Sequence, residues 1–384
     1  QKIFNIGEEG SRMKQGFQSM DSLVVALMDR VQEMADNPND ITGVPTGFYD
    51  LDRMTSGLQA GDLVVLAARP SMGKAQPLDA PVKTLNGWTA MGELAVGDAL
   101  ASVDGQPSVV TGLYPQGVRQ TYRLTFSDGR SAECCAEHLW RVMYRDWAAP
   151  RIVTTAELQT LLGKVCYRNR LWIDTVSGDF GSDAPLPLDP WVLGCLLGDG
   201  SLTGSGTVRF ANTSQELLER MRQRLPAEME LAHAEGCDYR VVQVHRGRVA
   251  GHAGVTPNPV RQVLDTLGLS DLSSANKFIP PLYLNAGKEA RLDVLRGLLD
   301  TDGWVERWGS IRFSSSSARL AQDVATLVRS LGGWCSITTK VPHFTNAAGQ
   351  RQAGLLAYVC HISHPQPQSL FLLSDKVLRA AQPR

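Results

Sequence analysis

The 384-residue sequence lacks an apolar run long enough to cross a bilayer, and it lacks a signal peptide. Its seven cysteines are scattered without paired Cys-x-x-Cys spacing, so neither a disulfide framework nor a zinc site is predicted. These absences argue against a membrane-spanning protein and against a small disulfide-rich secreted domain. A reducing cytoplasm is the compartment that we expect. The length is sufficient for two or three domains.

Strong net charge is also absent, because 38 Lys+Arg face 39 Asp+Glu for a net charge of −1. The charges are unevenly distributed along the chain. From residue 186 onward, 21 Lys+Arg and 17 Asp+Glu give +4, which leaves −5 for residues 1–185. The basic second half favours a polyanion as its partner.

A phosphate-binding loop in the first part of the chain lacks the residues that should follow its lysine. Residues 62–68 (DLVVLAA) predict a buried strand, and residues 69–74 (RPSMGK) match the back half of a Walker A loop. Such a loop requires Ser or Thr after its lysine to bind Mg²⁺, and then a helix whose N-terminal amides face the phosphates. Here Lys74 is followed by Ala75, and two prolines before residue 82 oppose a regular helix. The sequence therefore predicts an interrupted nucleotide site.

The residues before the interruption resemble part of a motor protein. Apolar residues at helical spacing predict an amphipathic helix: Met20, Leu23, Val24, Leu27, Met28 and Val31. With residues 42–74 (TGVPTGFYDLDRMTSGLQAGDLVVLAARPSMGK), this region resembles bacterial replicative hexameric helicases of the DnaB type, from the linker helix into the RecA-like domain. The resemblance implies that Ser71, Gly73 and Lys74 bind the phosphates of ATP. It also implies that the helicase, once the interruption has been removed by splicing, is a homo-hexamer on single-stranded DNA.

The residues that follow the interruption predict a run of short strands. Residues 82–88 (VKTLNGW) predict a hairpin with an Asn-Gly turn, and Asp128-Gly129 predicts another turn. This all-β region ends in the Pro- and Asp-rich linker at residues 183–190 (DAPLPLDP). Residues 75–100 (AQPLDAPVKTLNGWTAMGELAVGDAL) resemble the opening block of an intein, a self-excising protein insertion of the Hint fold.

A second block, residues 129–140 (GRSAECCAEHLW), also resembles an intein sequence. The resemblance implies that His138 destabilises the scissile Lys74–Ala75 amide by hydrogen-bonding its nitrogen and helping it leave. Cys135 occupies the position at which most inteins have a Thr that helps to polarise the same bond. This departure leaves the role of Cys135 open.

Ala75 lacks the Cys or Ser side chain with which most inteins begin, and it has no nucleophilic atom. One explanation is an inactive intein, or a Cys→Ala change that traps the precursor. The other is a natural intein class that lacks the first nucleophile and carries a Trp in the second block. There, an internal Cys near the C-terminus attacks the peptide bond directly. Trp140 lies two residues after His138, as that class requires, and we favour this explanation.

The late intein blocks, with the attacking Cys, a penultimate His and a terminal Asn, are not present before Arg384. Cys360 is the last cysteine and lacks the expected flanking residues, so we interpret it as a buried strand residue. We expect a C-terminally truncated fragment that does not splice by itself, because scission needs the missing segment.

Two similar strings form an internal repeat in the second half. Residues 192–200 (VLGCLLGDG) and 295–303 (LRGLLDTDG) resemble the LAGLIDADG motif of homing endonucleases. In that motif two helices pack through small residues, and each ends in an acid. The resemblance implies that Asp199 and Asp302 together bind Mg²⁺ for the hydrolysis of double-stranded DNA.

Strand and helix patterns follow each motif, which predicts the αββαββα order of a single-chain endonuclease. Lys277 matches a Lys block of intein endonucleases and is predicted to assist charge neutralisation at the scissile phosphate, or else to be a surface lysine before a turn. Six arginines are candidate phosphate or base contacts: Arg209, Arg240, Arg246, Arg248, Arg307 and Arg312.

The predicted fold class is multidomain α+β, in three parts. Residues 1–74 are the helicase flank, 75–185 the N-terminal part of a Hint splicing domain, and 186–384 a LAGLIDADG endonuclease. One alternative is a LAGLIDADG-derived DNA-binding module that does not cut, although such modules often lose an acid. The other is a helicase subunit with ATPase activity, which the interrupted loop opposes. We expect a cytoplasmic, nucleoid-associated protein without a membrane partner.

Overall fold

The structure is a computed structural model of the chain, and it divides into two compact units, Gln1–Pro70 and Ser71–Arg384. It describes residues 75–176, 178–204, 207–244, 258–345 and 351–380, together with residues 20, 24, 25, 28 and 349. Met20, Val24, Val25 and Met28 are helical, in agreement with the predicted amphipathic helix. The remainder of that helix, the predicted strand at 62–68 and the predicted ATP-binding residues Ser71, Gly73 and Lys74 lie outside the described residues.

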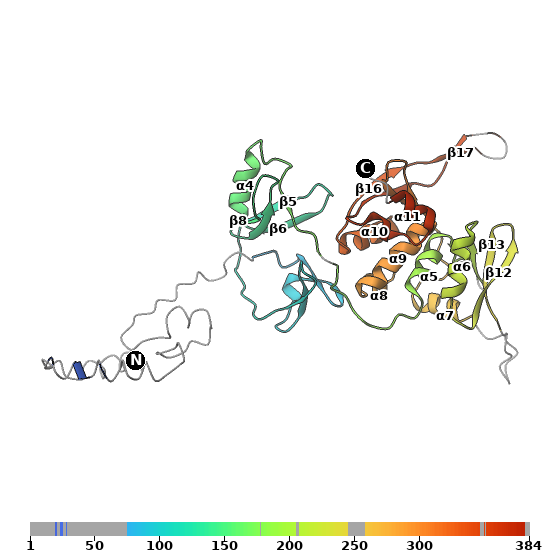
Figure 1. The fold of residues 1–384 in the computed structure, drawn as a ribbon, viewed down its shortest axis with the longest axis horizontal. Helices are drawn as coiled ribbons and strands as arrows, with labels where there is room; N and C mark the ends of the chain where they lie inside the picture. The colour runs from blue at the N-terminus through green and yellow to red at the C-terminus, as the bar shows by residue number, and fades with distance from the viewer. Residues whose placement is uncertain are drawn as a thin grey trace. The chain divides into compact units, whose positions relative to one another are not determined.

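The regular structure of residues 75–176 consists mainly of short antiparallel strands (Figure 1). They form three sheets with the orders β2-β1-β3-β4, β5-β6 and β8-β7-β9. The elements are β1 Pro81–Thr84, β2 Gly87–Ala90, η1 Met91–Glu93, β3 Ala99–Ala101, β4 Pro107–Val109, β5 Thr121–Thr125, β6 Ser131–Cys135, β7 Leu139–Met143, β8 Arg151–Thr154, α4 Thr155–Gly163 and β9 Trp172–Ile173.

The first predicted hairpin is confirmed, with a small change in its turn. Thr84 pairs with Gly87, so Leu85 and Asn86 form the two-residue connection between β1 and β2. Gly87 follows with a φ of 128°, a conformation that side-chain-bearing residues rarely adopt. The Asp128-Gly129 turn joins β5 to β6, and Gly129 has a φ of 84° there.

The expectation of an all-β region is wrong in one place, because α4 lies within it. The Thr154 hydroxyl accepts a hydrogen bond from Glu157 N, and the Glu157 carboxylate accepts one from Thr154 N. This capping box satisfies two backbone donors at the start of the helix, and Ala, Glu, Leu and Gln then favour helical backbone. The local start signal therefore outweighs the surrounding strand pattern.

Residues 190–380 contain two copies of the predicted αββαββα pattern. Their sheets have equivalent orders, β10-β11-β13-β12 and β14-β15-β19-β16, and all pairs are antiparallel. The first repeat is α5 Pro190–Gly198, β10 Gly200–Ser201, β11 Val208–Ala211, α6 Gln215–Arg224, β12 Met229–Glu235, β13 Asp238–Gln243 and α7 Pro259–Thr266. The second, preceded by the short α8 Pro281–Leu284, is α9 Lys288–Thr301, β14 Gly303–Val305, β15 Ile311–Ser315, α10 Ala318–Ser330, β16 Trp334–Lys340, β17 His343–Thr345, β18 Arg351–Ala353, β19 Ala357–Ser363, η2 Pro367–Leu370 and α11 Ser374–Ala380.

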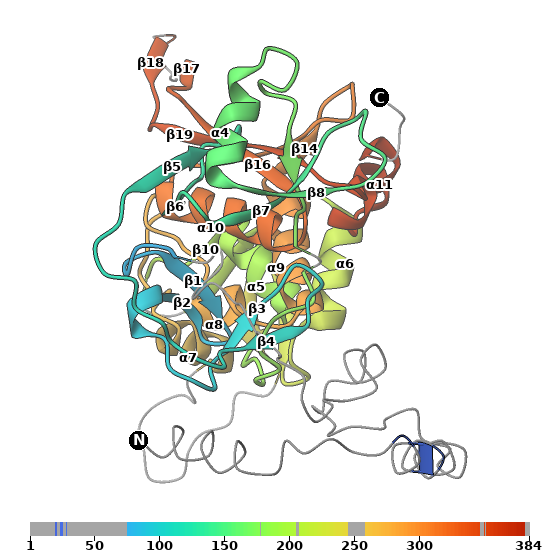
Figure 2. The ribbon, with the colours of Figure 1, turned by 90° about the vertical axis from the view of Figure 1, so that its left-hand side faces the viewer.

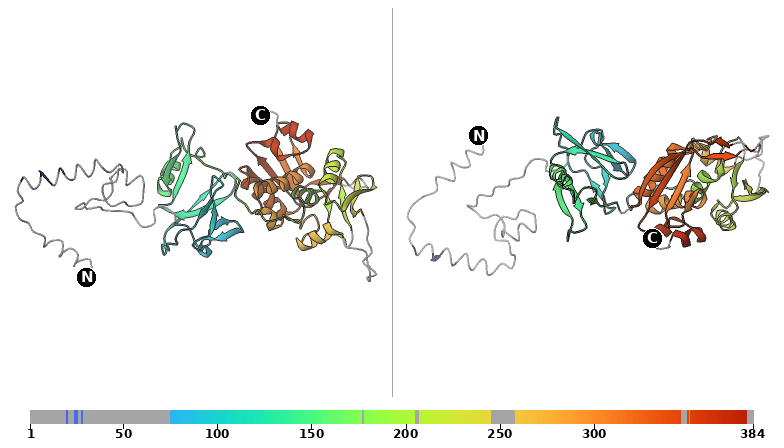
Figure 3. Two further views of the ribbon diagram at one scale, coloured as in Figure 1. Left: turned by 60° about the horizontal axis from the view of Figure 1, so that its bottom comes forward. Right: turned by 90° about the horizontal axis from the view of Figure 1, so that it is seen from above.

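Side-chain caps fix where the helices of both repeats begin. The Asp189 carboxylate accepts from Val192 N at 3.0 Å, and Pro190 occupies the first turn. Ser214 and Ser317 cap α6 and α10 in the same way. Helix α10 packs on the sheet of its own repeat (Figures 2 and 3), and one hydrophobic core extends through both repeats. Within the described residues, no helix is both long and apolar enough to cross a membrane.

Helices α5 and α9 lie side by side at the centre of this core (Figures 1 and 2). Glycines occupy their contact, as predicted. A Cβ on Gly194 would overlap the carbonyl oxygen of Val294 and lie 3.0 Å from the Cα of Gly297. A Cβ on Gly297 would overlap the carbonyl oxygen of Trp191 and lie 2.9 Å from the Cα of Gly194. The two backbones therefore approach more closely than any side chain permits.

We predict that Gly194→Ala or Gly297→Ala destabilises the fold, because the obstructing atoms belong to backbone and cannot rotate away. The expected loss in free energy of unfolding is about 1–3 kcal/mol or more. Urea unfolding followed by circular dichroism measures it. Gly163→Ala is the control, since a Cβ there has no neighbour within 4 Å. An equal effect of all three substitutions would contradict the close-approach explanation.

Candidate functional site

The two predicted acids end the two central helices in the same backbone conformation. Asp199 is the C-cap of α5, with φ −85° and ψ 1°, and Asp302 is the C-cap of α9, with φ −87° and ψ −1°. A Cβ on Gly198 would lie 3.5 Å from Asp302 Oδ2, so the end of one helix faces the acid of the other. The close packing of α5 and α9 thus brings both carboxylates to one place.

The charge of one acid opposes the ionisation of the other. Burial, together with the neighbouring Asp199 carboxylate, raises the pKa of Asp302 to about 6. Burial also raises the pKa of Asp199, although a hydrogen bond of 2.6 Å from Asn212 Nδ2 favours its charged form. Asp302 nevertheless retains exposure to solvent. A cation placed between the carboxylates would favour ionisation of both.

Lys277 lies at the end of α5, and its interpretation as a surface lysine is wrong. Only 6% of the residue is exposed. Its Nζ donates to the carbonyl oxygens of Leu197 at 2.9 Å, Gly198 at 3.0 Å and Gly200 at 2.7 Å. These carbonyls end the helix, where the partial charge of the backbone is negative. Lys277 therefore holds the backbone next to Asp199.

A second lysine, which the sequence did not reveal, has the equivalent place at the end of α9. Lys376 Nζ donates to the carbonyl oxygens of Leu299 at 2.8 Å, Asp300 at 2.7 Å and Gly303 at 2.7 Å. Lys376 belongs to α11, whereas Lys277 belongs to a loop before α8. The residues around the two lysines share no motif, so only the repeat symmetry could have indicated Lys376.

The donor set suits a hard cation such as Mg²⁺, which binds carboxylate oxygens, water and phosphate oxygens. Asp199 and Asp302 supply two carboxylates. No group of three or more His, Cys, Asp or Glu side chains in metal-binding geometry occurs among the described residues. A magnesium ion at this position would therefore keep ligand positions for water and for substrate phosphate. The residues fit the predicted metal.

The candidate DNA-contacting arginines differ between the two sheets. Arg209 and Arg240 lie opposite each other on β11 and β13, and neither has an ion pair within the described part of the chain. Arg312 instead pairs with Glu306, at 3.1 Å. Arg307 lies within the β14–β15 turn, and Arg246 and Arg248 lie outside the described residues.

The predicted splicing residues are linked by contacts that include Ala75. The carbonyl oxygen of Ala75 accepts a hydrogen bond of 3.0 Å from Cys135 N at the end of β6. The His138 and Trp140 rings meet edge to face, with centroids 5.0 Å apart. Ala75, Cys135, His138 and Trp140 thus occupy one region, although Lys74, the other half of the scissile bond, lies outside the described residues.

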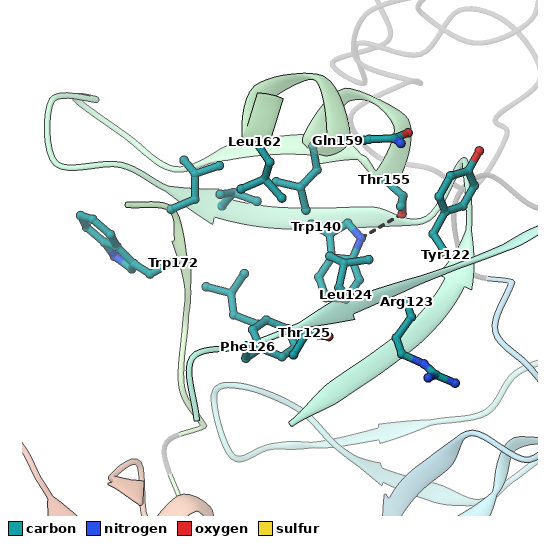
Figure 4. Close-up of a pocket in the computed structure, with 14 residues that line it drawn as sticks. Tyr122, Arg123, Leu124, Thr125, Phe126, Trp140, Thr155, Gln159, Leu162 and Trp172 are labelled. Carbon is teal, nitrogen blue, oxygen red and sulfur yellow. Dashed lines mark hydrogen bonds between the residues drawn. The ribbon is translucent and has the colours of Figure 1, made fainter. Parts of the chain in front are cut away.

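Thr155 joins these residues and was missed by the sequence analysis. Its hydroxyl accepts from Trp140 Nε1 at 3.0 Å, in an apolar pocket between β5, β7 and α4 (Figure 4). The same oxygen lies 3.2 Å from Cys134 Sγ and donates to the carbonyl oxygen of His138 at 3.3 Å. Thr155 begins α4, the helix that the sequence did not predict. Cys360 is buried in β19, as predicted, and its thiol donates to the carbonyl oxygen of Ala321.

Comparisons with protein families match two separate segments of the chain. Residues 43–82 match the DnaB-like helicase C terminal domain, and residues 289–349 match the LAGLIDADG-like domain. The replicative DNA helicase DnaB of Mycobacterium intracellulare is 30% identical over 338 residues, which are 82% of this chain and 51% of that protein. The chain therefore spans about half the length of this relative.

Two solved structures are also similar. The zinc-bound splicing domain of the Msm DnaB1 intein is 38% identical, with a TM-score of 0.18, over 20% of this chain and 60% of that one. I-DmoI in complex with DNA and Ca is 12% identical, with a TM-score of 0.31, over 50% of this chain and 95% of that one.

We predict that Asp302→Asn stabilises the metal-free protein at neutral pH. The folded-state pKa of Asp302 is raised above its ordinary value of 3.8 to about 6. Between these pH values the folded chain binds more protons than the unfolded chain, so stability falls as pH rises through this window. Asn removes this loss, and we expect a gain of about 1–2 kcal/mol at pH 7.5, reduced from the full shift by solvent screening.

Urea unfolding in EDTA measures this gain, which should disappear near pH 3.5, below both pKa values. Asp265→Asn, in which the replaced carboxylate lies on the exposed side of α7, is the control. An Asp302→Asn variant that is less stable than the wild type at pH 7.5 would contradict the electrostatic account.

Proposed function

We propose, from matches that fit a DnaB helicase interrupted by an intein with a homing endonuclease, that this chain cleaves double-stranded DNA through Asp199 and Asp302. The supporting observation is the pair of acids at adjacent ends of α5 and α9. Two equivalent repeats present two equivalent catalytic ends, which suits a substrate with two strands to be cut. We place this activity in the cytoplasm, at the nucleoid.

The acids, lysines and arginines of the chain have different roles in the proposed cleavage. Asp199 and Asp302 bind the metal, and Mg²⁺ supplies activation of water and stabilisation of the leaving oxygen. Lys277 and Lys376 fix the helix ends through backbone carbonyls and add positive charge beside the acids. Arg209 and Arg240, on the first sheet, would contact phosphates or bases.

The endonuclease is preferred over a non-cutting DNA-binding module because both acids are present and are held in the same geometry. ATP hydrolysis by the chain itself is not proposed. Residues 75–79 form an irregular turn that leads into β1, so the helix that must follow a Walker A lysine is missing. ATP binding through Ser71, Gly73 and Lys74, and a homo-hexamer on single-stranded DNA, belong to the spliced helicase.

We predict Mg²⁺-dependent cutting of an uninterrupted helicase gene across the codons that flank the insertion point after Lys74. Asp199→Asn or Asp302→Asn should reduce the cleavage rate about a hundredfold or more, since loss of a group that only orients a metal ligand already costs about 10- to 100-fold in other sites. A plasmid carrying the target measures the rate, and gel shift measures DNA affinity. Asp265→Asn, whose residue lies on α7, should cut normally. Binding without cleavage by the wild type would favour the non-cutting module.

A second proposed function is protein splicing by residues 75–185 together with a C-terminal segment that carries the late intein blocks. The observation that favours it is the grouping of Ala75, Cys135, His138 and Trp140. The thiolate of a Cys in the late block would attack the carbonyl carbon of Lys74 and form a thioester. The C–N bond to Ala75 breaks, and its nitrogen leaves as an amine with the help of His138.

We predict that a precursor with this segment restored yields joined helicase while Ala75 is intact. In such a precursor Thr155→Val should slow scission at Lys74–Ala75 about tenfold or more, because Trp140 and His138 lose their shared hydroxyl partner, whereas Thr155→Ser should retain it. Gel electrophoresis and mass spectrometry identify the products. Splicing only after Ala75→Cys would instead indicate the trapped mutant.

A further inference from the structure

The segment that carries Lys277 is held by the other repeat. Lys277 Nζ donates hydrogen bonds to the carbonyl oxygens at the end of α5, in the first repeat. Its neighbour Ile279 donates its backbone N–H to the Asp323 carboxylate on α10, at 2.8 Å. Ser317, the N-cap of α10, donates its hydroxyl to the carbonyl oxygen of Lys277 at 2.6 Å. Helix α10 belongs to the second repeat.

The segment that carries Lys376 is held in the opposite direction. Lys376 Nζ donates hydrogen bonds to the carbonyl oxygens at the end of α9, in the second repeat. Ser374, two residues earlier, donates its N–H to the Glu216 carboxylate at 3.1 Å and its hydroxyl at 2.8 Å. Arg220 Nη2 donates to the carbonyl oxygen of Leu372 at 3.2 Å. Glu216 and Arg220 lie on α6, in the first repeat.

The two holding contacts are not equal in strength. Asp323 is half-buried, and without it the Lys277 segment keeps one anchor on α10, the Ser317 hydroxyl that donates to the carbonyl oxygen of Lys277. Glu216 is more exposed, and without it the Lys376 segment keeps two anchors. One is Arg220, and the other is Asp300 of α9, which accepts from Leu372 N at 3.1 Å and Leu373 N at 3.3 Å. Loss of Asp323 should therefore displace its lysine more than loss of Glu216.

We propose that Asp323 and Glu216 are positioning residues that act crosswise, each holding the lysine at the catalytic helix end of the opposite repeat. The proposal rests on the endonuclease function. Each carboxylate fixes a lysine segment, the lysine fixes the last carbonyls of a central helix, and those carbonyls fix one acid. A change on α10 therefore acts at Asp199, and a change on α6 acts at Asp302.

The test is strand-resolved cleavage by the full chain of a duplex in which each strand carries a different 5′ label. Asp323→Ala should slow cleavage of one strand at least about tenfold relative to the other, as expected for loss of a hydrogen bond to a charged group. Glu216→Ala should give a smaller bias toward the opposite strand. On plasmid DNA both variants should accumulate nicked circles. DNA affinity should stay within about twofold of the wild type.

Matched controls lie on the same helices. Gln322→Ala removes the exposed neighbour of Asp323, and Glu219→Ala removes a carboxylate of α6 that contacts Arg222 and Gln223. Both should cut the two strands as the wild type does. Should an Ala variant fail to fold, Asp323→Asn and Glu216→Gln keep the side-chain volume and should show the same opposite biases at smaller size.

Equal slowing of both strands by each variant would overturn the crosswise assignment, and so would a bias of both variants toward the same strand. Absence of cleavage by the wild type is a different result, because it removes the endonuclease function on which the proposal rests.

Discussion

The close contact between α5 and α9 is the constraint on which the second half of the chain depends. Gly194, Gly198 and Gly297 permit it, and it places two helix C-termini side by side. Each C-terminus carries partial negative charge, and each also ends in an acid. Four sources of negative potential therefore meet in one place. Lys277 and Lys376 oppose them, each with three bonds to terminal carbonyls.

The two lysines compensate the partial negative charge of the backbone carbonyls. They do not form ion pairs with the two acids in the described part of the chain. Among the described residues, the hydrogen bonds of both lysines go to backbone carbonyls and not to Asp199 or Asp302, and the pKa of Asp302 is raised to about 6. A site that only had to be stable would place an ion pair or an apolar residue here. Retention of two repelling carboxylates is a cost in stability that suits a site whose ligand is a divalent cation.

The sequence predicted those parts of the site that depend on local signals. Asp199 and Asp302 follow glycine-containing apolar helices, and the structure places both at helix ends. Ser214 and Ser317 are local cap residues of the helices that follow the motifs. Lys376 and Thr155 could not be found in this way. Lys376 is separated from α9 in the chain by the whole of the second sheet, and Thr155 meets Trp140 because α4 begins where strands were expected. The positions of Lys376 and Thr155 depend on burial and on contacts between residues far apart in the chain. A short stretch of sequence does not indicate such contacts.

The repeats are equal at their centre and unequal around it. Asp199, Phe210 and Ser214 have their counterparts Asp302, Phe313 and Ser317 at one constant spacing in the chain. Asn212, however, corresponds to Ser315, so Asp199 accepts a side-chain amide and Asp302 does not. Arg209 lies opposite another arginine, whereas its counterpart Arg312 is paired with Glu306. The two sheets therefore present different arrangements of charge, and the second acid is the harder to ionise. A surface of this kind interacts unequally with the two halves of a duplex, which favours a DNA site without two-fold symmetry.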